Sequence, residues 1–176
     1  MFLRKCLVAV TGFAAVGLAG STAYGHITLE AQSAPAGSSY KAVFRVPHGC
    51  EGTATVKIRV RLPDGVSNVK PQPKPGWEVS TVMEKLAKPI VLDHGREVTE
   101  TVREFDWSGG KLPDSFYDEF VLRVELPDKP NATLYFPVVQ ECEKGVNRWI
   151  EIPEPGKTSR DYKEPAPALK LLPKNK

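Results

Sequence analysis

A two-residue alternation of apolar and polar side chains constrains the fold of this chain more than any other feature. It is clearest in Thr55–Leu62, where apolar side chains alternate with positively charged ones. Successive side chains of a β-strand point to opposite faces, so this pattern predicts a strand with one buried face. No segment shows a convincing period of 3.6 residues, so the sequence predicts an all-β protein.

Similar segments recur along the chain, separated by turn residues such as Pro63-Asp64-Gly65. They are Tyr40–Val46, Val66–Lys70, Trp77–Leu86, Val98–Trp107, Phe120–Leu126, Thr133–Gln140 and Trp149–Ile152. Ser108-Gly109-Gly110 is expected to end the strand before it, and Pro137 to mark an edge or a bulge. The pattern predicts an antiparallel β-sandwich, immunoglobulin-like in layout, with about eight or nine short strands.

The region beyond Pro153 has a different composition. It is rich in Pro, Lys and Glu and has no regular pattern before Leu169-Lys170-Leu171-Leu172. We therefore predict a domain over His26–Pro153 followed by a mobile tail, Glu154–Lys176. No segment after the N-terminal leader has 18 consecutive apolar residues, so no membrane span is expected in the mature chain.

The N-terminal residues predict an export signal. Basic residues precede the apolar run Cys6–Ala19, which is too short to span a membrane comfortably. Ala23 and Gly25 fit the pattern of small residues before a cleavage site. We therefore predict a cleaved signal peptide over residues 1–25, and a periplasmic or extracellular location for the mature protein.

Cleavage after Gly25 would make His26 the first residue of the mature protein. An N-terminal histidine can chelate one metal ion through its α-amine and its ring Nδ1. The α-amine loses its proton far more readily than a lysine side chain, so a metal can displace that proton near neutral pH. A rival cut after Ala19 would leave six residues before His26 and would remove the amine ligand.

Cys50 and Cys142 are the cysteines of the mature chain. An even pair in an exported protein predicts one disulfide, with two buried free thiols as the alternative. Glu51 follows Cys50 within the segment Pro47–Gly52, so the disulfide would fix its loop. We expect Glu51 to supply an oxygen ligand to a metal held by His26; the alternative is a solvated loop glutamate.

Other candidate ligands have weaker arguments. His48 is either an additional ligand or a loop histidine that hydrogen-bonds a backbone carbonyl, and we favour the second interpretation. Glu141 and Glu143 flank Cys142 and are alternative carboxylate ligands, whereas His94 lies in a turn and is expected to be exposed.

The tryptophans divide into two groups. Trp149 follows Cys142 closely enough to return to the same end of the sandwich, where its indole could cover a metal site and exclude water. Packing in the core is the alternative role for Trp149. Trp77 and Trp107 are assigned to the core or to loop packing.

These features together resemble the YcnI-like copper-binding domain family. The resemblance is carried by His26–Glu30, Pro47–Gly52, Pro75-Gly76-Trp77, Cys142 and Arg148–Pro153. It implies a β-sandwich that binds Cu(II) through a single-histidine brace, in which His26 provides two nitrogens and Glu51 a carboxylate. It also implies that Trp149 lies against the site. Some members carry a C-terminal membrane anchor, which this tail lacks.

The resemblance implies a Cu(II) carrier or metallochaperone in periplasmic copper handling, and not an enzyme. The expected recipient of the copper ion is a membrane copper transporter or a cuproenzyme. The alternative is a copper-dependent oxidase or monooxygenase built on an N-terminal histidine brace, which would need a second histidine such as His48 or His94. A third option is an adhesion-like sandwich in which the histidine start is incidental.

Nucleic acid is not an expected partner. The formal net charge is +3, and two of the basic residues, Arg4 and Lys5, lie in the predicted signal peptide. The remaining basic residues form no cluster interleaved with aromatic side chains, which is the usual footprint of a nucleic-acid-binding surface.

Overall fold

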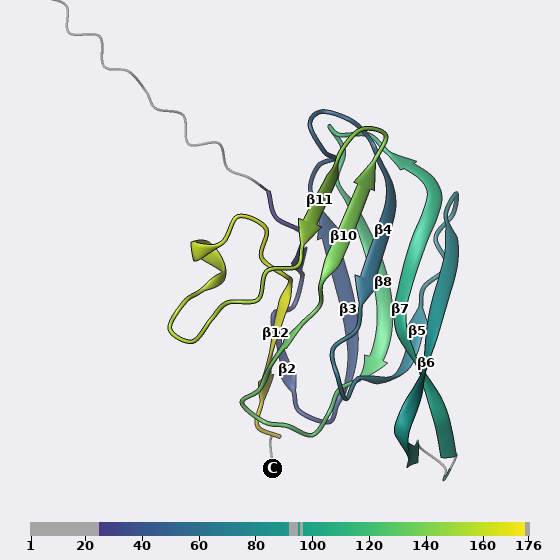
Figure 1. Ribbon diagram of the computed structural model, residues 1–176, viewed down its shortest axis with the longest axis vertical. Coiled ribbons are helices and arrows are strands. Elements are labelled where there is room, and N and C mark those ends of the chain that lie inside the picture. Colours follow the sequence, from purple (N-terminus) through teal and green to yellow (C-terminus); the bar gives the residue numbers. More distant parts are fainter. Residues whose placement is uncertain (1–24, 92–94, 96, 175–176) are drawn as a thin grey trace, which may run out of the picture.

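The computed structural model describes residues 25–91, 95 and 97–174, and these form twelve β-strands (Figure 1). In chain order they are β1 Thr28–Leu29, β2 Ser33–Pro35, β3 Ser39–Val46, β4 Thr55–Arg61, β5 Ser67–Pro71, β6 Glu78–Val91, β7 Glu97–Leu112, β8 Asp118–Glu125, β9 Thr133–Tyr135, β10 Val138–Cys142, β11 Val146–Trp149 and β12 Ala168–Leu172. The predicted signal peptide and His94 lie outside the described residues, except for Gly25.

Two sheets form the sandwich. One has the strand order β1-β3-β8-β5 and the other the order β11-β10-β4-β7-β6, and every pair within them is antiparallel. A small third sheet, β2-β12-β9, lies beside them at the left of Figure 1. This arrangement confirms the predicted all-β antiparallel sandwich. No helix in the described part of the chain is long and apolar enough to cross a membrane.

Strand β4 shows how the alternating sequence builds the core. Its side chains Ile58 and Val60 are fully buried and pair in register with Trp107 and Phe105 of β7, which are also fully buried. The intervening Arg59 points outward and forms ion pairs on the outer face of the sheet. Trp107 and Trp77 both pack against Phe120, so both tryptophans have the structural role predicted for them.

Strand β7 corrects the prediction of a break at Ser108-Gly109-Gly110. The strand continues to Leu112, and the register with β4 shifts between Thr55 and Lys57. Gly109 has a φ of +78°, and a Cβ on Gly110 would lie 2.2 Å from the Trp77 ring. The two glycines therefore form a bulge that lets an indole approach the backbone, and they do not end the strand.

Three other differences concern strand boundaries. Pro137 separates β9 from β10, which belong to different sheets, so Thr133–Gln140 is not one strand. The predicted strand Trp149–Ile152 lies earlier in the structure, because β11 spans Val146–Trp149. The strand count of eight or nine was too low, because the very short β1 and β2 carry too few residues to show an alternation.

The prediction of a mobile tail over Glu154–Lys176 is wrong for the part that forms β12. This strand pairs in parallel with β2 and antiparallel with β9, and its Leu169 and Leu171 side chains are fully buried in the core. The prediction failed because a short apolar alternation after a Pro- and Lys-rich segment carries little signal by itself. The domain therefore extends beyond Pro153 to include β12.

Truncating Leu169 tests whether β12 belongs to the cooperative core. Leu169→Ala is expected to lower the free energy of unfolding by about 2–5 kcal/mol, because it removes buried side-chain volume. The matched control is Leu172→Ala on the same strand, whose side chain is 43% exposed and whose loss should cost far less. Urea unfolding of both variants measures the difference, and equal losses would show that β12 is not part of the core.

Candidate metal site

The segments that carry the predicted site residues lie toward one end of the sandwich, the upper end in Figure 1. The loop between β3 and β4 and the turn between β10 and β11 lie here, joined by the disulfide Cys50–Cys142, with Cα atoms 5.8 Å apart. This confirms the predicted disulfide. The chain also enters the fold at this end, because a Cβ on Gly25 would lie 3.1 Å from the His48 ring.

Glu51 occupies a tight two-residue hairpin. The backbones of Cys50 and Thr53 exchange hydrogen bonds of 3.1 and 2.8 Å around Glu51 and Gly52. Both central residues have positive φ angles, +50° for Glu51 and +76° for Gly52. Hairpins of this kind favour Asn-Gly or Asp-Gly, since a glutamate in the left-handed region is strained. The strain at an exposed carboxylate is a feature often found at functional sites.

The surrounding contacts hold this hairpin in place. The backbone N–H of Gly49 donates a 2.9 Å hydrogen bond to Asp114 Oδ1. A Cβ on Gly49 would lie 1.8 Å from the Thr53 carbonyl oxygen, so only glycine fits there. The Thr53 hydroxyl lies 2.8 Å from the carbonyl oxygens of both Cys50 and Lys144. The Glu51 loop is therefore tied to the β10–β11 turn by more than the disulfide.

His26 packs against Trp149. The two ring centroids are 5.4 Å apart with an interplanar angle of 61°, an edge-on arrangement. Trp149 is only 3% exposed, whereas His26 is partly exposed. The Trp149 indole thus covers one side of the His26 ring.

The C-terminal segment forms another wall beside His26. A small cavity of about 90 Å³ is lined by His26, Ile27, Gln32, Ser159 and Pro165, among other residues. Glu151 fixes this segment, because its carboxylate accepts a 2.6 Å hydrogen bond from the Glu164 backbone N–H. The sequence-based prediction assigned Ser159, Glu164 and Pro165 to a mobile tail and therefore missed this wall.

Gln140 is a further residue of the site that the sequence analysis did not identify. Its side chain is fully buried, and its Oε1 accepts a 3.0 Å hydrogen bond from the indole N–H of Trp149. The alternation of β10 could have identified it, because Val138 points inward and the next inward position, two residues later, is occupied by the amide of Gln140. A polar side chain at such a position must find partners within the core.

The candidate ligands differ in what they already contact. His48 Nδ1 lies 2.6 Å from the Gly49 carbonyl oxygen, which is the backbone interaction favoured for it. Glu141 pairs with Arg59 at 2.8 Å, and Glu143 pairs with Lys111 at 2.5 Å. Among the described residues, Glu51 forms no ion pair, and it shares no hydrogen bond with His26. Its carboxylate is therefore the acidic group near the disulfide that is free to bind a cation.

The described side chains contain no group of three or more His, Cys, Asp and Glu residues arranged around a common metal position. A site here would thus depend on two side chains, His26 and Glu51, and on the α-amine that cleavage would create. In the uncleaved chain this nitrogen belongs to the peptide bond with Gly25. The donor set of imidazole, amine and carboxylate is chemically suited to a tetragonal Cu(II) ion.

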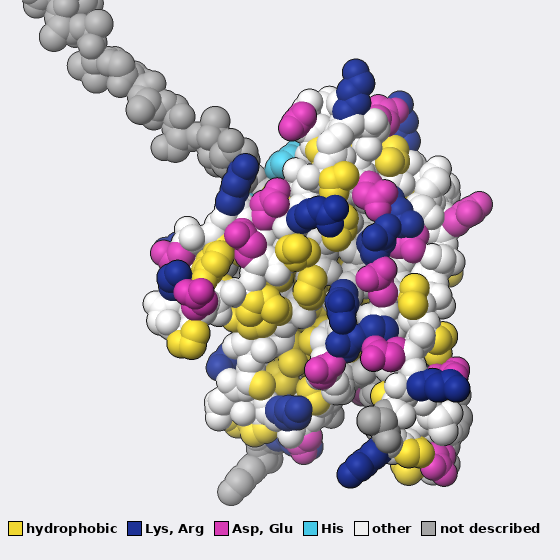
Figure 2. Space-filling model, viewed as in Figure 1, with side chains coloured by type: hydrophobic (Ala, Val, Ile, Leu, Met, Phe, Trp, Pro, Cys, Tyr) yellow, Lys and Arg dark blue, Asp and Glu magenta, His cyan; other side chains and the backbone are white. Residues whose placement is uncertain are grey.

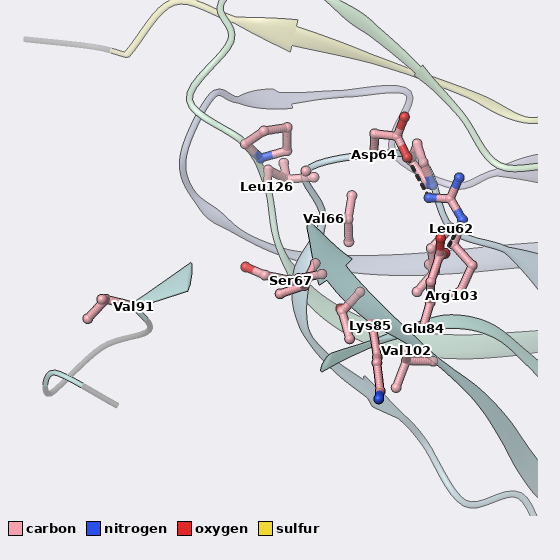
Figure 3. A pocket seen from close by; sticks show the side chains of 15 residues that line it. Leu62, Asp64, Val66, Ser67, Glu84, Lys85, Val91, Val102, Arg103 and Leu126 are labelled. Atoms are coloured by element: carbon pink, nitrogen blue, oxygen red, sulfur yellow. Dashed lines mark hydrogen bonds and ion pairs between the residues drawn. The ribbon is translucent and has the colours of Figure 1, made fainter. Parts of the chain in front are cut away.

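A second cavity, of about 390 Å³, lies near the opposite end of β4 (Figure 3). Arg103 lines it and forms ion pairs with Asp64 at 2.6 Å and Glu84 at 3.1 Å. The described residues that line it include neither His nor Cys, so they offer no imidazole or sulfur ligand for a transition metal. The histidine visible in Figure 2 lies instead near the upper end of the domain.

The fold and this end of the molecule define an immunoglobulin-like sandwich domain with a disulfide-pinned loop beside its N-terminal strand. The family described as Domain of unknown function (DUF1775) matches residues 26–171, and the chain belongs to that family. YcnI-like is another name for this family, so the resemblance seen in the sequence identified it correctly.

Comparison with solved structures supports the same fold. The chain is similar to an uncharacterized protein from Nocardia farcinica, whose crystal structure is described as revealing an immunoglobulin-like fold. The two are 27% identical with a TM-score of 0.60, and the match covers 84% of this chain and 98% of the other. No curated protein matches the sequence.

Proposed function

We propose that the exported chain is a Cu(II)-binding carrier or metallochaperone that begins at His26. The α-amine and Nδ1 of His26 chelate the ion, and the Glu51 carboxylate supplies an oxygen ligand. The observation that carries this proposal is the packing of His26 against the buried Trp149, at the end where the disulfide fixes the Glu51 loop. The match to the DUF1775 family, which covers residues 26–171, begins at the same histidine.

The donor set favours Cu(II) over other biological metals. Copper heads the divalent affinity series, and two nitrogens with one oxygen suit its tetragonal geometry. Structural zinc sites usually have four protein ligands, which the described residues at this end of the fold do not assemble. Cu(I) prefers sulfur, but both mature cysteines are in the disulfide, and Met83 lies on β6, at the far edge of its sheet from β11.

Metal titration tests this proposal. The protein is prepared with His26 as its first residue and titrated with Cu(II), Cu(I) and Zn(II) in competition with a chelator of known affinity. The expected order is tightest binding for Cu(II), with one ion per chain. Tighter binding of Cu(I) than of Cu(II) would contradict the proposed donor set.

A copper-dependent redox enzyme is the competing function. A brace of three nitrogens would need a second histidine beside His26, and His94 lies outside the described residues. Among the described residues, His48 could supply it through Nε2, because its Nδ1 interacts with the Gly49 carbonyl. Peroxide production from ascorbate by the copper-loaded protein distinguishes the two functions. Rapid turnover that is lost in His48→Ala and kept in Glu51→Ala would favour the enzyme; the carrier proposal predicts slow turnover in all three proteins.

Substituting Glu51 should separate stability from copper binding. Glu51→Asn creates the Asn-Gly pair that a hairpin with two positive φ angles prefers, so it should stabilise the fold by about 0.5–1 kcal/mol. The same variant should bind Cu(II) more weakly, because it lacks the carboxylate. Thermal unfolding and copper titration measure the two effects.

Glu51→Gln is the matched control for that pair of measurements. It removes the carboxylate but keeps a long side chain in the strained conformation, so binding should weaken without any gain in stability. Unchanged Cu(II) affinity in both Glu51 variants would remove Glu51 from the proposed ligand set.

A further inference from the structure

Gln140 makes an unusually complete set of buried hydrogen bonds. Its side chain is 0% exposed, and its Nε2 donates to the His48 carbonyl oxygen at 2.7 Å and to Thr55 Oγ1 at 2.8 Å. Its Oε1 accepts from Trp149 Nε1 at 3.0 Å and from Asn147 Nδ2 at 3.4 Å. Both amide protons and the amide oxygen are thus used inside the core.

These bonds connect the separate parts of the candidate site. The His48 carbonyl belongs to the loop that carries Glu51, and the Trp149 indole is the surface against which His26 packs. The backbone of Gln140 also approaches the disulfide, with Cys50 Sγ 3.7 Å from its carbonyl oxygen. The Gln140 side chain therefore connects the loop that carries Glu51 with the Trp149 indole, against which His26 packs.

The amide group is chemically suited to this position. An ionised glutamate would offer only acceptors, and would place a negative charge against the His48 carbonyl oxygen. Methionine has a similar length but would leave the indole N–H and the His48 carbonyl without partners in the core. The hydrogen-bonding pattern therefore requires a donor and an acceptor on one side chain.

We infer that Gln140 is a positioning residue that holds the Trp149 indole and the Glu51 loop in their positions around His26. This inference rests on the proposed function, because it assigns Gln140 a role in Cu(II) binding. Gln140 does not touch the metal; it acts through the residues that surround it. Removing a group that is hydrogen-bonded directly to a metal ligand typically changes metal affinity by about 10–100-fold. Gln140 acts one contact further away, so the low end of that range is expected.

The test compares Gln140→Met with Gln140→Glu in the chain that begins at His26. Methionine preserves packing and removes every hydrogen bond of the side chain, so Cu(II) affinity should fall by about tenfold. Glutamate, kept protonated by its buried position, retains an acceptor for the indole and one donor, so it should restore most of the affinity. A side chain that only filled space would give the opposite order, and that order would overturn the inference.

A metal-free readout keeps this inference separate from the proposed function. The carbon-bound ring protons of His26 lie beside the Trp149 indole, so their NMR shifts report the packing of the two rings. In Gln140→Met these shifts should move toward those of a free histidine, while Val124→Ala, a core truncation on β8 in the other sheet, should leave them in place. Unmoved His26 shifts in Gln140→Met would overturn the positioning role.

Each outcome assigns a failure to one proposal. If the unsubstituted protein binds no Cu(II) but the His26 shifts move in Gln140→Met, the proposed function fails and the positioning of Trp149 stands. If Cu(II) binds with equal affinity to wild type and Gln140→Met, the function stands and the inference fails. Should Gln140→Met not fold, Trp149→Phe removes the indole N–H donor in its place, and wild-type affinity in that variant would overturn the inference.

Discussion

Acetylating the α-amine of His26 is expected to produce the largest loss of Cu(II) binding of any single change. The acetyl group removes one of the two nitrogens that close the chelate ring and leaves every side chain in place. The loss should exceed the range of about 10–100-fold that is typical when a group outside the ligand set is removed. Competition titration of the free and acetylated forms measures it.

Two features of this experiment make it specific. The His26→Ala variant lacks the imidazole of the same chelate, so acetylating its α-amine should cause little additional loss, because the two changes are not additive. Unfolding curves of the free and acetylated forms should coincide, since the terminal nitrogen has no part in the core. An acetylated chain that binds Cu(II) as tightly as the free chain would place the metal elsewhere.

Removing the disulfide should have the largest effect on stability. Replacing Cys50 and Cys142 by serine is expected to lower the free energy of unfolding by about 2–5 kcal/mol, chiefly by releasing a long loop in the unfolded chain. Cu(II) affinity should also fall, because Cys50 directly precedes Glu51 in the strained hairpin. Urea unfolding and copper titration of the double variant measure these two losses.

The structure suggests a control for the disulfide experiment. Thr53 contacts the Cys50 and Lys144 carbonyl oxygens, so part of the loop geometry survives without the covalent bond. A Val124→Ala variant loses buried volume on β8 and leaves both the Glu51 loop and the wall beside His26 intact, so it should lose stability and keep its copper affinity. If the serine variant also keeps full affinity, the disulfide stabilises the fold without contributing to the site.

The sandwich could be predicted because its main strands carry their own signal. Ile58 and Val60 alternate with charged residues, and this pattern is set by the two faces of the sheet. The disulfide could be predicted from an even number of cysteines in a chain expected to be exported. Strand β12 was missed because its partners, β2 and β9, are distant in sequence, so its order depends on tertiary pairing that no local pattern encodes.

The sequence suggested residues for the candidate site but not their geometry. His26, Glu51 and Trp149 were chosen from chain position and family resemblance, and the structure brings His26 to Trp149. The left-handed conformation of Glu51 and the ion pairs of Glu141 and Glu143 depend on neighbours that only the folded chain supplies. The buried hydrogen bonds of Gln140 also depend on the folded chain, because they join segments that are distant in sequence.

The N-terminal residue of the exported protein tests the central claim most directly, because the amine ligand exists only if processing exposes His26. Intact-mass spectrometry of the protein recovered from outside the cytoplasm of its natural host gives that residue unambiguously. The account predicts a chain that begins at His26 and contains one disulfide. A mature chain that begins at Gly20, or at any residue other than His26, would contradict it.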